Sequence, residues 1–125
     1  MIALDASALL AFLFREPGQE IVAQELGKSC ISSVNLAEVL GRFARDGHDP
    51  RMVFDRLRRS PLDLVPFLGE DAVLAAALLP RTRHLGLSVG DRACLALAAT
   101  RGITALTADS AWLSLDVGVR VRLIR

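Results

Sequence analysis

The sequence contains no long hydrophobic run, and this limits how the chain can relate to a membrane. Its longest apolar stretches, at residues 8–14 and 72–79, fall well short of the roughly 18 residues that a membrane-spanning helix needs. Met1 leads directly into an apolar run and the charged Asp5, which differs from the pattern of a signal peptide. We therefore expect a cytoplasmic protein with no membrane-spanning segment.

Cysteine and histidine are also scarce. Cys30 and Cys94 lie in apolar segments, and they show neither CxxC nor Cys/His spacing. This pattern is typical of reduced core residues in a cytosolic protein. His48 and His84 are too isolated in the sequence to form a zinc site.

Several catalytic motifs are absent. There is no GxxxxGK[ST] phosphate-binding loop, and no GxGxxG follows the first apolar run. A haloacid-dehalogenase-like phosphatase would carry a second aspartate where Ser7 stands, and a response-regulator receiver would need a late lysine, whereas Lys28 is the only lysine. Ser7, Ser32 and Ser33 have no plausible histidine and acid partners for a hydrolase triad.

The 125 residues are enough for one domain, which we expect to span residues 1–125 around a single core. Charged residues make up 23% and leave a net charge of +1, so no basic tail indicates nucleic acid, although a local basic patch matters more than the sum. The apolar fraction of 52% exceeds what a core of this size accounts for. The remainder predicts an apolar surface that a partner covers.

Apolar periodicity alternates between strand-like and helix-like segments along the whole chain. We expect strands at residues 2–5, 30–34, 62–67, 103–108 and 119–124, the last an edge strand with its arginines pointing outward. We expect helices at residues 7–16, 19–26, 35–45, 51–60, 69–79 and 91–101, and a short helical turn at 110–115. Pro80 should end or kink a helix, and Gly102 should cap one. This alternation predicts an α/β fold with a mainly parallel sheet.

Four acidic residues each lie just beyond an apolar run, and we call them the acidic quartet: Asp5, Glu38, Asp91 and Asp109. In a parallel sheet the carboxyl ends of the strands open on one crevice, so these side chains should converge there. Carboxylates in one crevice repel one another, and hard divalent cations relieve that repulsion. The quartet therefore predicts a metal-dependent phosphoryl-transfer site.

Each member of the quartet also has a simpler structural interpretation. Asp5, Asp91 and Asp109 each stand where an aspartate can cap the helix or turn that follows. Glu38 could pair with Arg42 four residues later, or complement the helix dipole as a first-turn glutamate. For any single acid capping is the simpler explanation, and only the shared location of all four favours chemistry.

The segments that carry the quartet make the chain resemble a PIN-domain ribonuclease, specifically a VapC-type toxin of a bacterial toxin–antitoxin pair. The similar segments are LDASALLAFLFREPG at 4–18, SSVNLAEVLGRF at 32–43, LGLSVGDRACLALAATRG at 85–102 and LTADSAW at 106–112. The resemblance implies a three-layer PIN-like fold with a central five-stranded parallel sheet flanked by helices. It also implies a Mg²⁺- or Mn²⁺-dependent endoribonuclease with a cognate antitoxin.

The resemblance extends to individual site residues. It implies that the acidic quartet is both catalytic and metal-binding. Our hypothesis is that Asp5 and Asp91 bind the metal directly, and that Glu38 and Asp109 complete the shell through water or hold a second ion. Ser7 matches a hydroxyl residue beside the first acid, where it could orient a carboxylate or a metal-bound water. Thr107 and Trp112 match the final motif, where we expect structural support.

Partners follow less directly from the sequence. An acidic crevice repels RNA, so phosphate contacts should come from arginines at its rim, and the candidates are Arg15, Arg42, Arg45, Arg83 and Arg92. The apolar excess is compatible with a homodimer and with an antitoxin groove, for which residues 8–26 and Arg51–Leu57 are candidates. Two alternatives stay open: a catalytically silent PIN-like binding module, and a DNA nuclease that uses the same acidic site.

Overall fold

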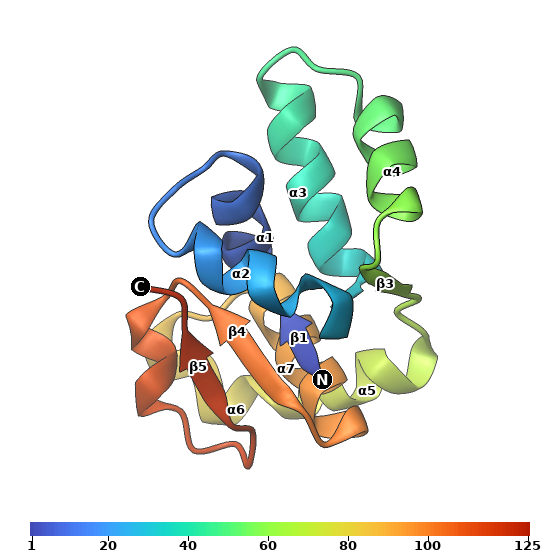
Figure 1. Cartoon of the computed structure of the whole chain (residues 1–125). Coiled ribbons are helices and arrows are strands. Elements are labelled where there is room, and N and C mark those ends of the chain that lie inside the picture. Colours follow the sequence, from blue (N-terminus) through green and yellow to red (C-terminus); the bar gives the residue numbers. More distant parts are fainter.

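Five short parallel strands form the central sheet, in the order β3-β2-β1-β4-β5 (Figure 1). The computed structural model describes residues 1–125. The strands are β1 (Ile2–Leu4), β2 (Ser29–Ser32), β3 (Asp63–Val65), β4 (Thr104–Thr107) and β5 (Val121–Leu123). The chain builds outward from β1 to β3 and then crosses to β4, so β1 and β4 flank the point where the strand order reverses.

Seven α-helices and three 3₁₀ turns connect the strands. The helices are α1 (Ala6–Leu13), α2 (Gln19–Glu25), α3 (Ser33–Arg45), α4 (Pro50–Arg59), α5 (Gly69–Ala77), α6 (Leu79–Thr82) and α7 (Val89–Arg101). The 3₁₀ turns are η1 (Leu26–Lys28), η2 (Arg83–Leu85) and η3 (Ser110–Ser114). None of the helices combines the length and the apolar composition that crossing a membrane requires.

Helices cover both faces of the sheet, which gives the three-layer architecture expected from the sequence. Because side chains alternate along a strand, Ile2 and Leu4 join one core with residues from α1, α2, α3 and α4. Ala3 faces the other side, where it packs with Cys94 and other residues of α7. Both cysteines are unpaired and buried, as predicted. In Figure 1, α3 and α4 lie side by side and extend beyond the sheet as a helical hairpin.

α3 and α7 each begin two residues earlier than the sequence predicted, in each case because a serine caps the helix. α3 starts at Ser33, since the Ser32 hydroxyl accepts a hydrogen bond from the backbone N–H of Val34 at 3.2 Å. The predicted second strand therefore ends at Ser32, and its extension to Val34 was wrong. α7 starts at Val89, two residues before Asp91, because Ser88 is the N-cap.

Other boundaries follow the sequence more closely. α5 ends at Ala77, and α6 begins with Pro80 in its first turn, so the predicted break is confirmed. Gly102 ends α7 with a left-handed φ of 63°, as a C-terminal cap requires. β5 lies at the sheet edge with Arg122 exposed. α1 ends at Leu13 instead of residue 16, and Arg15 then takes a positive φ of 57°.

Candidate active site

The carboxyl ends of β1, β2 and β4 bring the chain segments that carry three of the acids to one edge of the sheet. Asp5 follows β1 directly, Asp109 stands two residues after β4, and Glu38 lies on α3, which follows β2 without a loop. Asp91 belongs to the first turn of α7. Asp5 therefore lies at the carboxyl edge of the sheet, where the strand order reverses.

Asp5 is the most buried of the acids, with 4% of its surface exposed. It occupies the N-cap position of α1, yet its side chain makes no capping hydrogen bond, so the capping interpretation of this residue was wrong. Its Oδ2 instead accepts hydrogen bonds from Ser7 Oγ at 2.7 Å and from Thr107 Oγ1 at 2.9 Å. Burial raises the pKa of Asp5, the two hydroxyls oppose that rise, and the nearby Asp91 charge adds to it.

The two hydroxyl groups also tie the β4 loop to the start of α1. Ser7 Oγ accepts a hydrogen bond from the backbone N–H of Ala108 at 3.0 Å. Thr107 Oγ1 accepts one from the backbone N–H of Asp109 at 3.1 Å and lies 3.3 Å from Ser7 Oγ. The orientation of the Asp5 carboxylate is thus fixed by one hydroxyl from α1 and one from β4.

Glu38 is held by contacts that the sequence interpretation did not anticipate. Asn35 Nδ2 donates a hydrogen bond to Glu38 Oε1 at 2.9 Å. Arg42 pairs with Asp46 at 3.3 Å, so the predicted Glu38–Arg42 ion pair was wrong. Because α3 begins at Ser33, Glu38 also lies beyond the first turn, and the helix-dipole interpretation fails.

Partial burial raises the pKa of Glu38, the hydrogen bond from Asn35 opposes this rise, and the charges of Asp5 and Asp91 add to it. The Asp91 carboxylate therefore lies close enough to disfavour the charged forms of both Asp5 and Glu38. The raised pKa values of Asp5 and Glu38 mark a site where negative charge accumulates without a compensating cation from the protein.

The other two acids do act as caps. Asp91 Oδ2 accepts a hydrogen bond from the backbone N–H of Ser88 at 2.9 Å, completing a capping box at the start of α7. Asp109 is exposed, and its Oδ1 accepts from the backbone N–H of Ala111 at 3.0 Å. In each carboxylate the second oxygen accepts no hydrogen bond from the protein.

The chemistry of the carboxylate oxygens fits a hard divalent cation, although their spacing does not form a closed metal site. No three carboxylate, imidazole or thiolate side chains are gathered around one point closely enough to hold a metal ion. The mutually repelling groups Asp5, Glu38 and Asp91 supply only oxygen donors, with no nitrogen or sulfur among them. Oxygen donors of this kind suit Mg²⁺ or Mn²⁺, and Mg²⁺ commonly keeps several waters alongside few protein ligands.

The sequence of this chain matches the family model of the PIN domain over residues 2–117. The chain belongs to the PIN-domain family. Comparison with curated protein sequences finds no match.

Solved structures share the fold of this PIN domain. A toxin–antitoxin complex from Klebsiella pneumoniae superposes with a TM-score of 0.77 at 14% identity, covering 100% of this chain and 98% of the other. DNA-bound VapBC from Salmonella typhimurium gives 0.72 at 16% identity, covering 99% and 98%. VapC20 of Mycobacterium tuberculosis, described as a toxin that cleaves the sarcin-ricin loop, gives 0.71 at 19% identity, covering 96% and 99%. At these identities the likeness establishes the fold.

The five candidate arginines occupy different environments in the PIN domain. Arg15 and Arg83 are exposed and form no ion pair. Arg42 and Arg45 both pair with Asp46, and Arg42 also lies over the Phe14 ring. Arg92 donates from its guanidinium to a carbonyl of α5 and is half-buried. Arg15 and Arg83 are therefore the candidates most available for phosphate.

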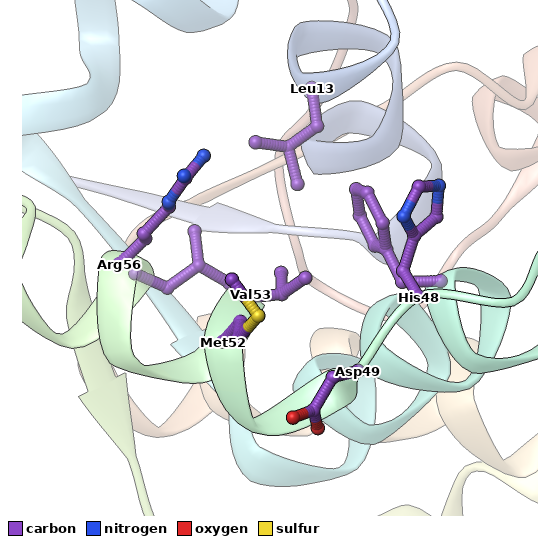
Figure 2. A pocket seen from close by; sticks show the side chains of 8 residues that line it. Leu13, His48, Asp49, Met52, Val53 and Arg56 are labelled. Atoms are coloured by element: carbon purple, nitrogen blue, oxygen red, sulfur yellow. The ribbon is translucent and has the colours of Figure 1, made fainter.

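A cavity of about 380 Å³ lies away from the acidic quartet, between α1, the α3–α4 turn and α4 (Figure 2). Figure 2 shows Leu13 of α1 facing Met52, Val53 and Arg56 of α4 across it, with His48 at one side. Most of its lining is apolar, and no member of the quartet contributes to it. The cavity joins the two segments that the sequence marked as candidates for a protein partner.

Three residues of the site were missed from the sequence: Ser88, Asn35 and Gly90. Ser88 and Asp91 form an S-x-x-D pattern, which is a recognisable capping-box signal. Asn35 stands three residues before Glu38 on the same helix, a spacing that places side chains side by side. Only the packing of α3 against α7 shows that Gly90 belongs with them, because its carbonyl shares the Asn35 amide with Glu38.

Proposed function

We propose that this PIN domain is a Mg²⁺- or Mn²⁺-dependent endoribonuclease that acts as the toxin of a toxin–antitoxin pair. The observation that carries the proposal is the proximity of three carboxylates, Asp5, Glu38 and Asp91. Burial raises the pKa of Asp5 and of Glu38, and the charge of Asp91 adds to both shifts. Folding a chain around uncompensated negative charge costs stability, and a functional site gives a reason for that cost.

Asp5 and Asp91 would hold the ion, and Glu38 and Asp109 would complete its surroundings. A divalent ion bound there supplies positive charge that stabilises the transition state of phosphodiester hydrolysis. The protein's contribution is orientation: Ser7 and Thr107 fix the Asp5 carboxylate, and the capping box fixes one oxygen of Asp91 while leaving the other available.

The first test uses purified chain with a structured RNA, in Mg²⁺ or Mn²⁺ and in EDTA, beside Asp91→Asn. The asparagine amide oxygen can still accept from Ser88, so this variant should fold normally, as circular dichroism would show. We expect its metal-dependent cleavage to fall at least about 100-fold, the upper range for loss of a group that supports a metal ligand. Equal cleavage by both proteins would identify a contaminant, and unfolding of the variant would favour a purely structural role.

A catalytically silent binding module is the second candidate. It is favoured by the absence of a gathered ligand set and by the capping hydrogen bonds of Asp91 and Asp109. Metal-binding calorimetry separates the two, because a silent module should bind Mn²⁺ no better than Asp91→Asn does. Competition between RNA and DNA substrates would then distinguish a ribonuclease from a DNA nuclease that uses the same carboxylates.

Phosphate contacts are proposed for the exposed arginines at the rim. We expect Arg83→Glu to weaken RNA binding similarly for all sequences and to reduce the slope of log affinity against log salt by about 1. Arg120→Glu is the matched control. Arg120 is exposed and lies just before β5, at the amino end of the strands, whereas the acidic residues lie at the carboxyl end. An equal loss in both variants would indicate a general charge effect instead of a local contact.

The protein partners are proposed from the apolar surfaces. The solved structures that share this fold include toxin–antitoxin complexes, which supports an antitoxin for this chain. The cavity between α1 and α4 combines Leu13, from the segment 8–26, with Met52, Val53 and Leu57 from the segment 51–57. An amphipathic antitoxin segment could place apolar side chains there. A homodimer would cover further apolar surface.

A further inference from the structure

Asn35 connects two elements of the acidic site that are far apart in the sequence. Its side chain is fully buried, with 0% exposed. The single nitrogen Nδ2 donates to Glu38 Oε1 at 2.9 Å and to the backbone carbonyl of Gly90 at 2.9 Å. Both of its hydrogens are therefore committed, one to a carboxylate on α3 and one to the first turn of α7.

The other end of the Asn35 amide argues against a purely structural role. Oδ1 is buried and has no hydrogen-bond partner. A buried acceptor without a partner destabilises the folded state, and an apolar residue of similar size would avoid that cost. What Asn35 contributes is therefore the pair of hydrogen bonds that its NH₂ group makes.

Gly90 supplies the space in which the Glu38 carboxylate lies. A β-carbon built on Gly90 would stand 2.5 Å from Glu38 Cδ and 2.5 Å from Oε2, so any larger residue would displace the carboxylate. The φ of Gly90 is not left-handed, so other residues could adopt its backbone conformation. The absence of a side chain at this position is explained by the close approach of Glu38.

We propose that Asn35 and Gly90 are positioning residues that place the Glu38 carboxylate beside Asp5 and Asp91, ready to take part in metal binding. Glutamate has several rotatable bonds, and restraining it in advance removes the entropy that metal binding would otherwise cost. Asn35 holds the carboxylate by a hydrogen bond, and the missing side chain of Gly90 leaves the space that the carboxylate occupies. This inference rests on the proposed metal-dependent activity.

The test measures Mn²⁺ affinity by calorimetry, together with thermal stability and RNA cleavage, in Asn35→Leu and Gly90→Ala. Both variants should lose about 10- to 100-fold in Mn²⁺ affinity, the range seen when a group that orients a metal ligand is removed. Gly90→Ala should lose this affinity with an unchanged or higher melting temperature, because alanine favours a helix and only the mobile end of Glu38 must move. A merely structural role would lower stability and metal affinity together.

Two further proteins make the result decisive. Thr82→Val is the matched control for buried polar groups, since the fully buried Thr82 donates only to the backbone carbonyls of Leu78, between α5 and α6, and Leu79 of α6. It should keep the parent's Mn²⁺ affinity. In a Glu38→Ala background, Asn35→Leu should change Mn²⁺ affinity less than about twofold, because a residue that acts through Glu38 has nothing left to position.

The outcomes separate the inference from the proposed function. Parent-like Mn²⁺ affinity in Asn35→Leu and Gly90→Ala would overturn the positioning role, even if the parent cleaves RNA. An Asn35→Leu loss that persists in full without Glu38 would overturn it as well. Failure of the parent to cleave RNA while it binds Mn²⁺ would count against the nuclease, and the affinity measurements would still decide the role of Asn35.

Discussion

Asp5→Asn is expected to abolish metal-dependent cleavage and, at neutral pH, to make the protein more stable. Asp5 is nearly fully buried, and burial raises its pKa, so the folded chain is destabilised when this carboxylate carries its charge. Asparagine has almost the same shape and can accept the hydrogen bonds of Ser7 and Thr107 without that charge. If Asp5 binds the metal as proposed, its loss should lower cleavage by at least about 100-fold.

The pH dependence of this stabilisation has a definite sign. The pKa of Asp5 in the folded chain lies above its ordinary value of 3.8, so between these two values the folded state binds more protons than the unfolded state. The free energy of unfolding of the parent therefore falls as pH rises through that window. The advantage of Asp5→Asn should be absent below pH 3.8, grow across the window, and be complete above the folded pKa.

Urea unfolding of both proteins from acidic to neutral pH would measure this difference, with RNA cleavage measured in parallel. Asp116→Asn is the control, because Asp116 is exposed and no hydrogen bond to its carboxylate is present. It should leave cleavage unchanged and stability within about 0.5 kcal/mol. Added Mn²⁺ should raise the melting temperature of the parent but not of Asp5→Asn. A destabilised Asp5→Asn would contradict the assigned effect of burial.

The sequence predicted the positions of the acids that directly follow strands. Asp5 and Asp109 follow apolar runs whose ends fix where their backbones emerge from the sheet, so a parallel α/β fold already places them at one edge. The helix starts were predicted less well, because Ser32 and Ser88 extend α3 and α7 by capping them. A cap depends on one hydrogen bond, whereas hydrophobic periodicity reports only the body of the helix.

Side-chain contacts across the fold were beyond the reach of the sequence. The sequence offered Arg42 as the partner of Glu38 because the two residues have helical spacing. In the structure Arg42 pairs with Asp46, and Asn35 binds Glu38 instead. The shared hydrogen bond to Gly90 requires α3 to pack against α7, and local spacing carries no information about that packing.

In the structure, helix capping and metal binding can involve different oxygens of the same carboxylate. Capping and metal binding do not exclude each other, because Asp91 caps α7 through Oδ2 alone and keeps Oδ1 free of protein hydrogen bonds. Asp109 divides its oxygens in the same way at η3. A capping hydrogen bond fixes the rotation of a carboxylate, and a fixed carboxylate is a better ligand because less entropy is lost on binding. Capping by one carboxylate oxygen is therefore compatible with the metal binding proposed for these residues.

Trp112→Ala is expected to cost about 3–5 kcal/mol of stability, the usual range for deleting a large buried aromatic side chain. Trp112 is the only tryptophan and has 0% of its surface exposed, in the core beneath η3 with Ala3, Cys94 and Ala105. A domain of ordinary stability has about 5–15 kcal/mol in total, so this variant should lose a large share of its stability and unfold at a markedly lower urea concentration than the parent.

The comparison with Trp112→Phe distinguishes support from chemistry. The indole Nε1 has no hydrogen-bond partner, so phenylalanine loses only volume and should retain most of the stability and the cleavage activity. Circular dichroism in urea measures both variants without relying on tryptophan fluorescence. Trp112 holds the turn that Asp109 caps, and its loss should reduce activity only as far as it unfolds the chain. A Trp112→Ala protein with parental stability but no cleavage would instead give the indole a direct part in the reaction.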